Sequence, residues 1–478
     1  MLNWRRSRSR CGIAQVLVAV LGCVALGAQG QQVPASTPAA RAAAPADARA
    51  PANKASSILF RNVRIFDGKS AQVSAPRDVL VKGNRITRIA AGVKADSDAL
   101  VIDGSGRVLM PGLVDMHWHA LLAVPPVAVA LKADRSYLVL VAGAEATRTL
   151  MRGFTTVRDV GGASFGLKQA IDEGVILGPR IYPSGAVITV TSGHGDFREL
   201  SDLPRVLGAP GSRTDLLGDT AIADSPDEVR MRVREQLMRG ASQIKLTAGG
   251  GVASPHSPLD VTTFTEPELQ AAVVAARNWG TYVAAHAYTS DAIRQAIDAG
   301  VQCIEHGNLM DEDTARLMAR KGTWLSTQPF PPELADAFPR GSDEWNKAQE
   351  VFAGTDRTYR LAKKYKIKTA FGTDVLFSGA LAAQQGRILA SLTRWYSPAE
   401  ALVMATGTNG ELLALSGKRS PYTGPVGVVR EGALADLLLV NGDPTADISL
   451  IARPEQNFVV IMKDGVIYKN VLAVASAR

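Results

Sequence analysis

Two histidines spaced two residues apart, His117 and His119, end an apolar segment that begins at Pro111. On a β-strand alternate side chains lie on the same face, so both imidazoles would point in one direction. Two neutral imidazoles that converge from one strand end form half of a metal site, because imidazole is a common ligand of Zn²⁺ and related ions. The spacing therefore predicts metal chemistry at the end of this strand.

Four more side chains that can bind metals, directly or after modification, lie in or just after later apolar segments. They are Lys245 within 242–247, His286 at the end of 281–286, His306 after 301–305 and Asp374 after 368–373. In a barrel of parallel strands, the C-terminal strand ends gather at one mouth, where catalysis takes place. On such a fold, these distant residues would share one pocket with His117 and His119.

The pattern between residue 111 and about residue 415 predicts such a barrel. Short apolar segments alternate with helical patterns, and helix starts are marked by Ser225-Pro226-Asp227-Glu228 and by Thr265-Glu266-Pro267-Glu268. Eight alternations favour the α/β class and a (β/α)8 TIM-like barrel over an open doubly wound sheet. The eight predicted strands are 112–118, 154–159, 180–187, 242–247, 281–286, 301–305, 322–327 and 368–373.

Strand patterns also flank the barrel on both sides. Residues 57–110 read as short strands separated by turn signals, and strands return at 436–440 and 459–462. We expect residues 57–110 and 421–478 to form one small β-sandwich domain, with the barrel domain, residues 111–420, inserted between them.

The N-terminus has the features of an export signal. Basic residues precede an apolar stretch over 11–28, and small residues follow it, so residues 1–30 are predicted to be a cleaved signal peptide. An uncleaved signal anchor is the alternative, because the apolar stretch is almost long enough to span a bilayer. Residues 31–56 are rich in Ala and Pro and are predicted to be a disordered linker. The expected location is therefore secreted or periplasmic.

The charge balance argues against nucleic-acid binding. The chain has 53 Lys and Arg against 45 Asp and Glu, a net charge of +8. Seven of those basic residues but only one acidic residue lie within 1–56, which leaves a net charge of +2 for the remainder. The excess positive charge thus belongs mainly to the export segment, and no nucleic-acid partner or membrane association after signal cleavage is expected.

Several motifs together resemble the amidohydrolase superfamily over nearly all of residues 57–478. Within it the chain is similar to the imidazolonepropionase-like, Xaa-Pro dipeptidase (prolidase-like) branch, which includes secreted carboxypeptidase-like enzymes and ochratoxin-degrading amidohydrolases. The matching pieces are 111–119, 153–159, the His286 and His306 segments, Gly372-Thr373-Asp374, 405–415 and 427–437.

This resemblance implies a centre with two divalent metal ions. It implies that His117, His119 and Asp374 bind one ion, that His286 and His306 bind the other, and that N-carboxylated Lys245 bridges them. An unmodified lysine would repel the metals, whereas a carbamate is an anionic oxygen donor, and the mixed ligand set favours Zn²⁺, with Mn²⁺ or Co²⁺ as alternatives. An ordinary ion-pairing role remains the other interpretation of Lys245.

The resemblance also implies a mechanism. A hydroxide that bridges the metals attacks the scissile carbonyl carbon, and Asp374 accepts its proton and passes it to the leaving amine. His194 is similar to the family position that donates a hydrogen bond to the substrate carbonyl. Tyr288 could reach the oxyanion or a substrate carboxylate, or it could simply pack. Arg158 could bind a carboxylate or pair with its neighbour Asp159, and His256 could be a substrate contact or a plain loop residue.

Three loops are expected to surround the mouth of the barrel: 188–224, 328–350 and 375–386. Their apolar content predicts an apolar or aromatic substrate. The residues that carry this expectation are Leu200, Leu203, Leu207, Phe330, Phe338, Val375, Leu376 and Phe377.

The leading functional hypothesis is a binuclear amidohydrolase that cleaves an amide bond next to a free carboxylate. Dipeptides, N-acyl amino acids and ochratoxin-type amides of phenylalanine are the expected substrates. A hydrolase of a cyclic amide or lactone, of the imidazolonepropionase type, is the alternative; Lys245 and the export signal argue against it. A non-enzymatic scaffold is a third hypothesis, disfavoured because all six ligand positions are filled. By resemblance, a homo-oligomer is expected.

Overall fold

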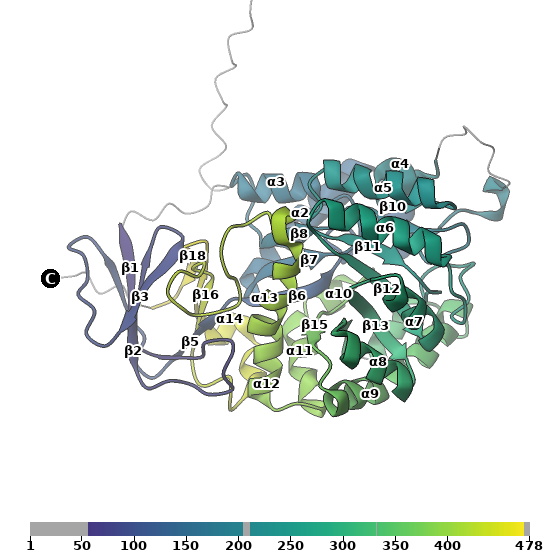
Figure 1. Ribbon diagram of the computed structural model, residues 1–478. Helices are drawn as coiled ribbons and strands as arrows, with labels where there is room; N and C mark the ends of the chain where they lie inside the picture. The colour runs from purple at the N-terminus through teal and green to yellow at the C-terminus, as the bar shows by residue number, and fades with distance from the viewer. Residues whose placement is uncertain (1–55, 204–210, 331, 473–478) are drawn as a thin grey trace, which may run out of the picture. The chain divides into compact units, whose positions relative to one another are not determined.

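The computed structural model describes residues 56–203, 211–330 and 332–472 (Figure 1). These residues belong to one compact unit. The predicted signal peptide and all but the last residue of the predicted linker lie outside the described residues, so these segments and the domain boundaries stay predictions. Among the described helices, none combines the length and the apolar character that crossing a membrane would require.

Parallel strands form the predicted barrel. One sheet contains β6, β7 and β8, and a second runs in the order β10-β9-β11-β12-β13-β14-β15. The last strand of the second sheet, β15, lies beside the first strand of the other sheet, β6. Between them the N–H of Asp374, which follows β15, donates to the carbonyl of His117 on β6 over 2.8 Å. The strands are β6 (Leu113–Trp118), β7 (Phe154–Asp159), β8 (Arg180–Pro183), β9 (Val187–Thr189), β10 (Thr220–Ile222), β11 (Ile244–Thr247), β12 (Val283–Thr289), β13 (Cys303–Leu309), β14 (Trp324–Thr327) and β15 (Thr369–Phe371).

The third predicted strand, 180–187, is wrong as one continuous element. The chain bends at Gly185, whose φ of +74° lies in the left-handed region that favours glycine. β8 therefore pairs with β7, while β9 pairs with β11. The break separates β8 from β9, and the long loop that carries His194 begins after β9.

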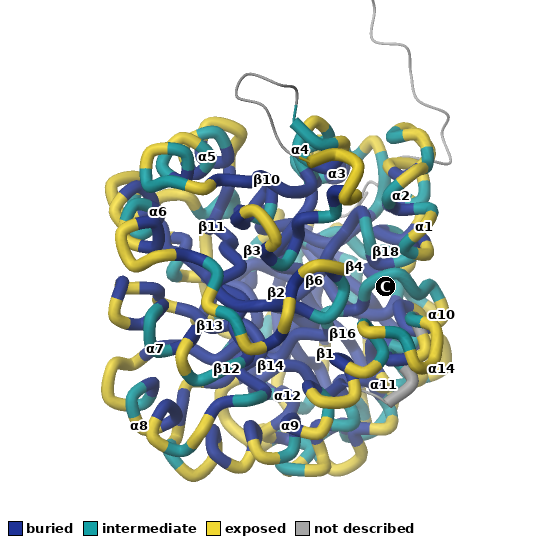
Figure 2. Tube along the Cα trace, turned by 90° about the vertical axis from the view of Figure 1, so that its right-hand side faces the viewer, coloured by how far each residue is buried: buried dark blue, intermediate teal, exposed yellow. Residues whose placement is uncertain are grey.

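Helices surround the strands, and Figure 2 shows their exposed outer faces around a buried interior. Both predicted helix starts are confirmed: the Ser225 side chain accepts from the Glu228 N–H, and the Thr265 N–H donates to Glu268 Oε2 over 2.7 Å. The helices are α1 (Val127–Lys132), α2 (Arg135–Met151), α3 (Phe165–Asp172), α4 (Arg213–Leu217), α5 (Pro226–Met238), α6 (Glu266–Asn278), α7 (Ser290–Asp298), α8 (Glu312–Lys321), α9 (Asp343–Tyr365), α10 (Gly379–Ala382), α11 (Gln385–Ala390), α12 (Pro398–Val403), α13 (Asn409–Leu413) and α14 (Pro454–Asn457).

The two ends of the described chain form one β domain, as predicted. β16 pairs antiparallel with β5, which joins the C-terminal strands to the N-terminal ones in the order β18-β17-β16-β5-β1-β2-β3, with β4 beside β1. The strands are β1 (Ser57–Ile65), β2 (Arg77–Lys82), β3 (Arg85–Ala90), β4 (Leu100–Asp103), β5 (Val108–Pro111), β16 (Leu437–Val440), β17 (Phe458–Lys463) and β18 (Val466–Asn470).

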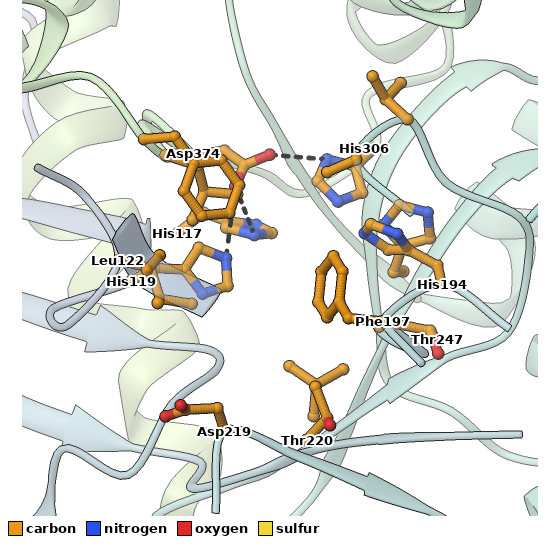
Figure 3. Close-up of a pocket in the computed structure, with 18 of the residues that line it drawn as sticks. His117, His119, Leu122, His194, Phe197, Asp219, Thr220, Thr247, His306 and Asp374 are labelled. Carbon is orange, nitrogen blue, oxygen red and sulfur yellow. Dashed lines mark ion pairs between the residues drawn. The ribbon is translucent and has the colours of Figure 1, made fainter. Parts of the chain in front are cut away.

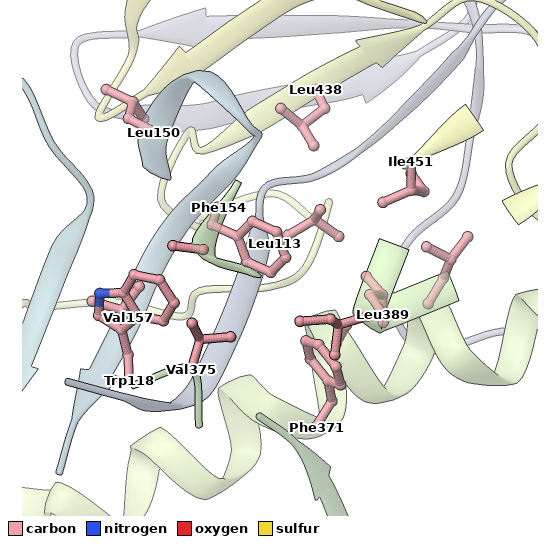
Figure 4. Packing of buried hydrophobic residues seen from close by; sticks show 14 of the residues in the cluster. Leu113, Trp118, Leu150, Phe154, Val157, Phe371, Val375, Leu389, Leu438 and Ile451 are labelled. Atoms are coloured by element: carbon pink, nitrogen blue, oxygen red, sulfur yellow. The ribbon is translucent and has the colours of Figure 1, made fainter. Parts of the chain in front are cut away.

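An apolar cluster joins the β domain to the barrel (Figure 4). Leu438 of β16 and Phe458 of β17 pack with Leu113 of β6 and Phe154 of β7, and all four are fully buried. β6 also carries His117 and His119, so this packing supports the strand that positions two of the candidate ligands.

Candidate metal centre

All eight predicted site residues line one pocket at the C-terminal ends of the barrel strands. They come from different strands and from the loop after β9, so only the closed barrel brings them together. The eight residues are His117, His119, His194, Lys245, His286, Tyr288, His306 and Asp374.

The Asp374 carboxylate lies beside three of the candidate ligands, His117, His119 and His306 (Figure 3). Its Oδ1 is 3.3 Å from His117 Nε2 and 3.4 Å from His119 Nε2, and its Oδ2 is 3.8 Å from His306 Nδ1. His117, His306 and Asp374 offer ligand atoms that lie within 4.8 Å of one another. Asp374 Oδ1 is buried and has no hydrogen-bond partner among the described residues. A divalent cation would satisfy such an oxygen, so the residues fit a metal site.

Each of the four candidate histidine ligands has one ring nitrogen bonded to an acceptor of the protein. A neutral imidazole carries one hydrogen, so a hydrogen bond to an acceptor leaves the other nitrogen with a free lone pair. Metal-binding histidines are oriented in this way. The four contacts are His117 Nδ1 to Glu305 Oε2 (2.8 Å), His119 Nδ1 to the Gly161 carbonyl (3.1 Å), His286 Nε2 to the Gly250 carbonyl (2.9 Å) and His306 Nδ1 to Gln328 Oε1 (2.8 Å).

Burial keeps three of these imidazoles neutral. It lowers the pKa of His117, His286 and His306 well below the ordinary value, and the Lys245 ammonium lowers each further. A neutral imidazole is the form that binds metals, so the pocket prepares its ligands before a cation arrives.

Lys245 lies on β11 with 3% of its surface exposed. Burial lowers the pKa of its ammonium, although the Glu305 and Asp374 carboxylates oppose that effect. It forms no ion pair with any residue in the described ranges, which argues against an ordinary ion-pairing role. A buried lysine whose pKa is lowered has more of the neutral, reactive amine.

The backbone is strained at two candidate ligands. His306 has a φ of +78° and Asp374 a φ of +50°, backbone angles that residues other than glycine seldom adopt. At Asp374 a buried neighbour holds this conformation: Thr373 Oγ1 donates to Asp115 Oδ2 over 2.6 Å, and the His117 N–H donates to Asp115 Oδ1 over 3.1 Å. Asp115 thereby ties the two candidate ligand segments to each other.

Arg158 does not pair with its neighbour Asp159, and its partner Glu305 was missed in the sequence analysis. Arg158 is fully buried and does not line the pocket; its guanidinium donates to Glu305 Oε1 over 2.6 Å and to the Met116 carbonyl over 2.6 Å. Asp159 instead accepts backbone N–H groups. Arg158 and Lys245 keep the pKa of Glu305 below its ordinary value despite burial. A single carboxylate inside an apolar strand was the available signal.

His194 and Tyr288 flank His286. Their ring centroids lie 4.4 Å and 4.6 Å from that of His286. Burial lowers the pKa of His194 to about 3 and raises the pKa of the Tyr288 phenol, so both side chains are neutral at pH 7. His256, by contrast, is exposed and does not line this pocket.

Apolar side chains form the walls of the pocket, as predicted, but not all from the predicted residues. Phe330, Phe338, Leu376 and Phe377 line it. The prediction that Leu200 and Leu203 line the pocket was wrong, because 68% and 42% of their surfaces are exposed. The same prediction was wrong for Val375, which is buried in the core. Leu207 lies outside the described residues. The sequence analysis missed Leu122, Leu131, Phe197, Leu334 and Phe352, which line the pocket from neighbouring segments.

A comparison with protein families identifies this architecture. The model of the amidohydrolase family matches residues 108–472. The chain belongs to the amidohydrolase family. It is therefore a hydrolase that acts on amide bonds, which confirms the expected enzyme class.

Individual relatives agree with the expected branch. The chain is 31% identical over 382 residues to ochratoxinase from Aspergillus niger, which covers 76% of each protein. A crystal structure of an amidohydrolase matches with a TM-score of 0.80 and 34% identity, over 87% of this chain and 100% of the other. A prolidase complexed with N-methylphosphonate-L-proline matches with a TM-score of 0.80, 31% identity and the same coverage.

Proposed function

We propose that the protein is a binuclear metal-dependent amidohydrolase that cleaves an amide bond next to a free carboxylate. One observation carries this proposal: four histidines each have one ring nitrogen bonded to a protein acceptor, and three of them lie within 3.8 Å of the Asp374 carboxylate, whose Oδ1 has no hydrogen-bond partner among the described residues. Such an arrangement supports a cation site, because metal-binding histidines are oriented by hydrogen bonds of this kind.

Two divalent ions, expected to be Zn²⁺, would supply a nucleophilic hydroxide at neutral pH and polarise the scissile carbonyl. In this proposal His117, His119 and Asp374 would hold one ion, and His286 and His306 would hold the other. Lys245 would be a ligand to both ions once its neutral amine had added to CO₂ and lost a proton, which forms a carbamate. The lowered pKa of Lys245 favours that reaction, because only the unprotonated amine can form the new bond.

The remaining side chains bind the substrate and move the proton. Asp374 takes the proton of the attacking nucleophile and delivers it to the leaving nitrogen, since an amide anion is a poor leaving group. His194 donates a hydrogen bond to the substrate carbonyl. Tyr288, whose raised pKa keeps its hydroxyl protonated, donates to the oxyanion or to the substrate carboxylate.

The walls of the pocket support an apolar or aromatic substrate. Phe330 and Phe352 pack with a centroid distance of 4.9 Å on the side of His306, and Leu122, Phe197 and Phe377 line other parts of the wall. The similarity to ochratoxinase and to prolidases supports N-acyl amino acids and dipeptides as substrate classes. We therefore propose amides of apolar amino acids, including ochratoxin-type amides of phenylalanine.

Export and self-association complete the proposal. We propose that residues 1–30 direct the chain out of the cytoplasm and are then removed, and that the mature chains form a homo-oligomer. N-terminal sequencing of the exported protein would test the first point, and light scattering the second.

Metal analysis combined with a substrate panel tests the central proposal. Two metal ions per chain are expected, as is hydrolysis of N-acyl-phenylalanines that falls at least about tenfold when the carboxylate is esterified. Mass spectrometry of the released amino acid measures turnover. His256→Ala is the matched control, because this histidine is exposed outside the pocket and its loss should leave both metals in place.

The variant Lys245→Met distinguishes a site that holds one metal ion from a site that holds two. We expect this variant to lose most of its activity and at least one of its two ions. Full activity after thorough chelation and dialysis would overturn the metal mechanism. Two ions per chain in Lys245→Met would remove the bridging carbamate from the proposal while leaving the histidine ligands.

A further inference from the structure

The loops that follow β9 and β11 are joined around one buried hydroxyl. Ser254 is fully buried, and its Oγ lies 3.0 Å from His194 Nδ1 and 2.8 Å from the backbone nitrogen of Gly195. His194 lines the pocket, and its Nε2 has no hydrogen-bond partner in the described ranges. The two ring nitrogens of His194 thus face different surroundings: one faces the protein and the other faces the pocket.

The hydrogen-bonding capacity of a serine hydroxyl determines the direction of these contacts. A hydroxyl has one hydrogen to donate and two lone pairs to accept with. The Gly195 N–H can only donate, so it takes one lone pair of Ser254 Oγ. Among the described residues, the acceptor within reach of the hydroxyl hydrogen is His194 Nδ1. That nitrogen therefore accepts, and the imidazole hydrogen stays on Nε2.

We infer that Ser254 is a positioning residue that fixes His194 as a hydrogen-bond donor toward the substrate carbonyl oxygen. The expected effect on catalysis rests on the proposed function, whereas the hydrogen bonds between Ser254, Gly195 and His194 do not. This role of Ser254 concerns the neutral ring, because an imidazolium would donate from Nε2 with or without Ser254. Without the Ser254 hydroxyl, a neutral His194 could place its hydrogen on Nδ1 and present a lone pair to the carbonyl, which would repel it.

Neighbouring contacts hold both partners in place. A Cβ atom at Gly251 would lie 2.1 Å from His194 Nδ1, so the ring packs directly against this backbone. Lys347 Nζ donates to the Ser254 carbonyl over 2.9 Å, and Ser192 Oγ donates to the His256 carbonyl over 2.6 Å. These contacts hold the loop of Ser254 against the segment that carries His194, with one side of the His194 ring packed on the Gly251 backbone.

Solid-state ¹⁵N NMR of zinc-loaded, histidine-labelled enzyme tests the tautomer directly. The chain has six histidines, and His194→Asn identifies the signals of this ring. We expect a protonated Nε2 and an unprotonated Nδ1 in the wild type. In Ser254→Ala we expect the Nδ1–H form to appear as well, whereas Ser254→Thr, which keeps the hydroxyl, should retain the wild-type pattern. Ser257→Ala controls for loss of a buried hydroxyl from the same loop.

Steady-state kinetics on an N-acyl-phenylalanine tests the consequence. We expect Ser254→Ala to lower kcat about tenfold with KM changed less than twofold, since the donor acts on developing charge. If Ser254 acts through His194, Ser254→Ala should cost nothing further in a His194→Asn background.

Three results would overturn the inference. They are an Nδ1–H tautomer in the wild type, an unchanged tautomer in Ser254→Ala, and a full additional loss of kcat in the double variant. Because the NMR measurement needs no substrate, a wild type that cleaves no amide would reject the proposed function while leaving this assignment testable.

Discussion

Two buried arginines in different parts of the molecule each form ion pairs with carboxylates. Arg158 lies inside the barrel on β7, where Glu305 is its ion-pair partner at 2.6 Å. Arg180 lies on β8 at the junction with the β domain, where it pairs with Asp436 at 2.9 Å and Asp464 at 2.5 Å. Both guanidiniums are almost completely removed from water, so each requires its carboxylate partners.

The difference lies in what the carboxylates do with their other hydrogen bonds. Glu305 gives one oxygen to Arg158 and the other to His117 Nδ1, a candidate metal ligand. Asp436 instead accepts the backbone N–H of Asp464 over 2.7 Å, and the neighbouring Lys463 donates to the Gly178 carbonyl over 2.9 Å. The Arg158 network therefore orients a candidate metal ligand, whereas the Arg180 network stabilises the contact between the barrel and the β domain. Substitutions in each network should separate these roles.

Arg158→Met should have the largest effect, because it would leave Glu305 buried without its cation. We expect the free energy of unfolding of metal-free protein to fall by about 3–5 kcal/mol, and metal binding to weaken as well. Denaturant unfolding and metal titration measure the two losses. Arg158→Met/Glu305→Leu should recover stability without recovering metal binding, since it removes the unpaired charge but also the partner of His117. Recovery of both properties would remove Glu305 from the metal site.

Arg180→Met should destabilise the protein without affecting the metals. Asp436 would lose its cation in a buried setting, whereas 42% of the Asp464 side chain is exposed and can be hydrated. We expect a loss of roughly 3 kcal/mol in the free energy of unfolding and an unchanged metal content. A loss of bound metal from folded Arg180→Met would contradict the separation of the two networks.

The difference between a ligand and the partner that orients it explains how much could be predicted from the sequence. The barrel, the β domain and the candidate ligands were predictable, because strand-end histidines and periodic apolar segments are local signals. The partners that orient those ligands were not. Glu305 on β13 reaches His117 on β6, which is not a neighbouring strand, and Gln328 reaches His306 from the end of the adjacent β14. The Gly161 and Gly250 carbonyls have no side-chain signature at all. The break at Gly185 was missed because a single glycine is also compatible with a continuous strand.

The junction network also predicts a pH dependence of stability. Burial, with help from Arg180, lowers the pKa of Lys463 from 10.5 to about 8. Between those values the unfolded chain binds the proton and the folded chain does not, so stability should rise with pH across this window by about 2–3 kcal/mol. Unfolding free energies of wild type and Lys463→Met, measured from pH 7.5 to 10.5, should diverge by this amount. Parallel curves would contradict the lowered pKa.

Glu305→Gln is the most selective test, because it keeps the shape of the side chain. Arg158 can only donate hydrogen bonds, so the new amide must turn its oxygen toward Arg158 and its NH₂ group toward His117 Nδ1. That nitrogen would then have to accept, which moves the imidazole hydrogen to Nε2, the nitrogen that faces Asp374. A metal ion must displace this hydrogen, so affinity should fall by about 10–100-fold. Competition with a chromophoric chelator measures it, and Asp436→Asn is the matched control, with an affinity within about twofold of wild type if only the Arg158 network serves the metals.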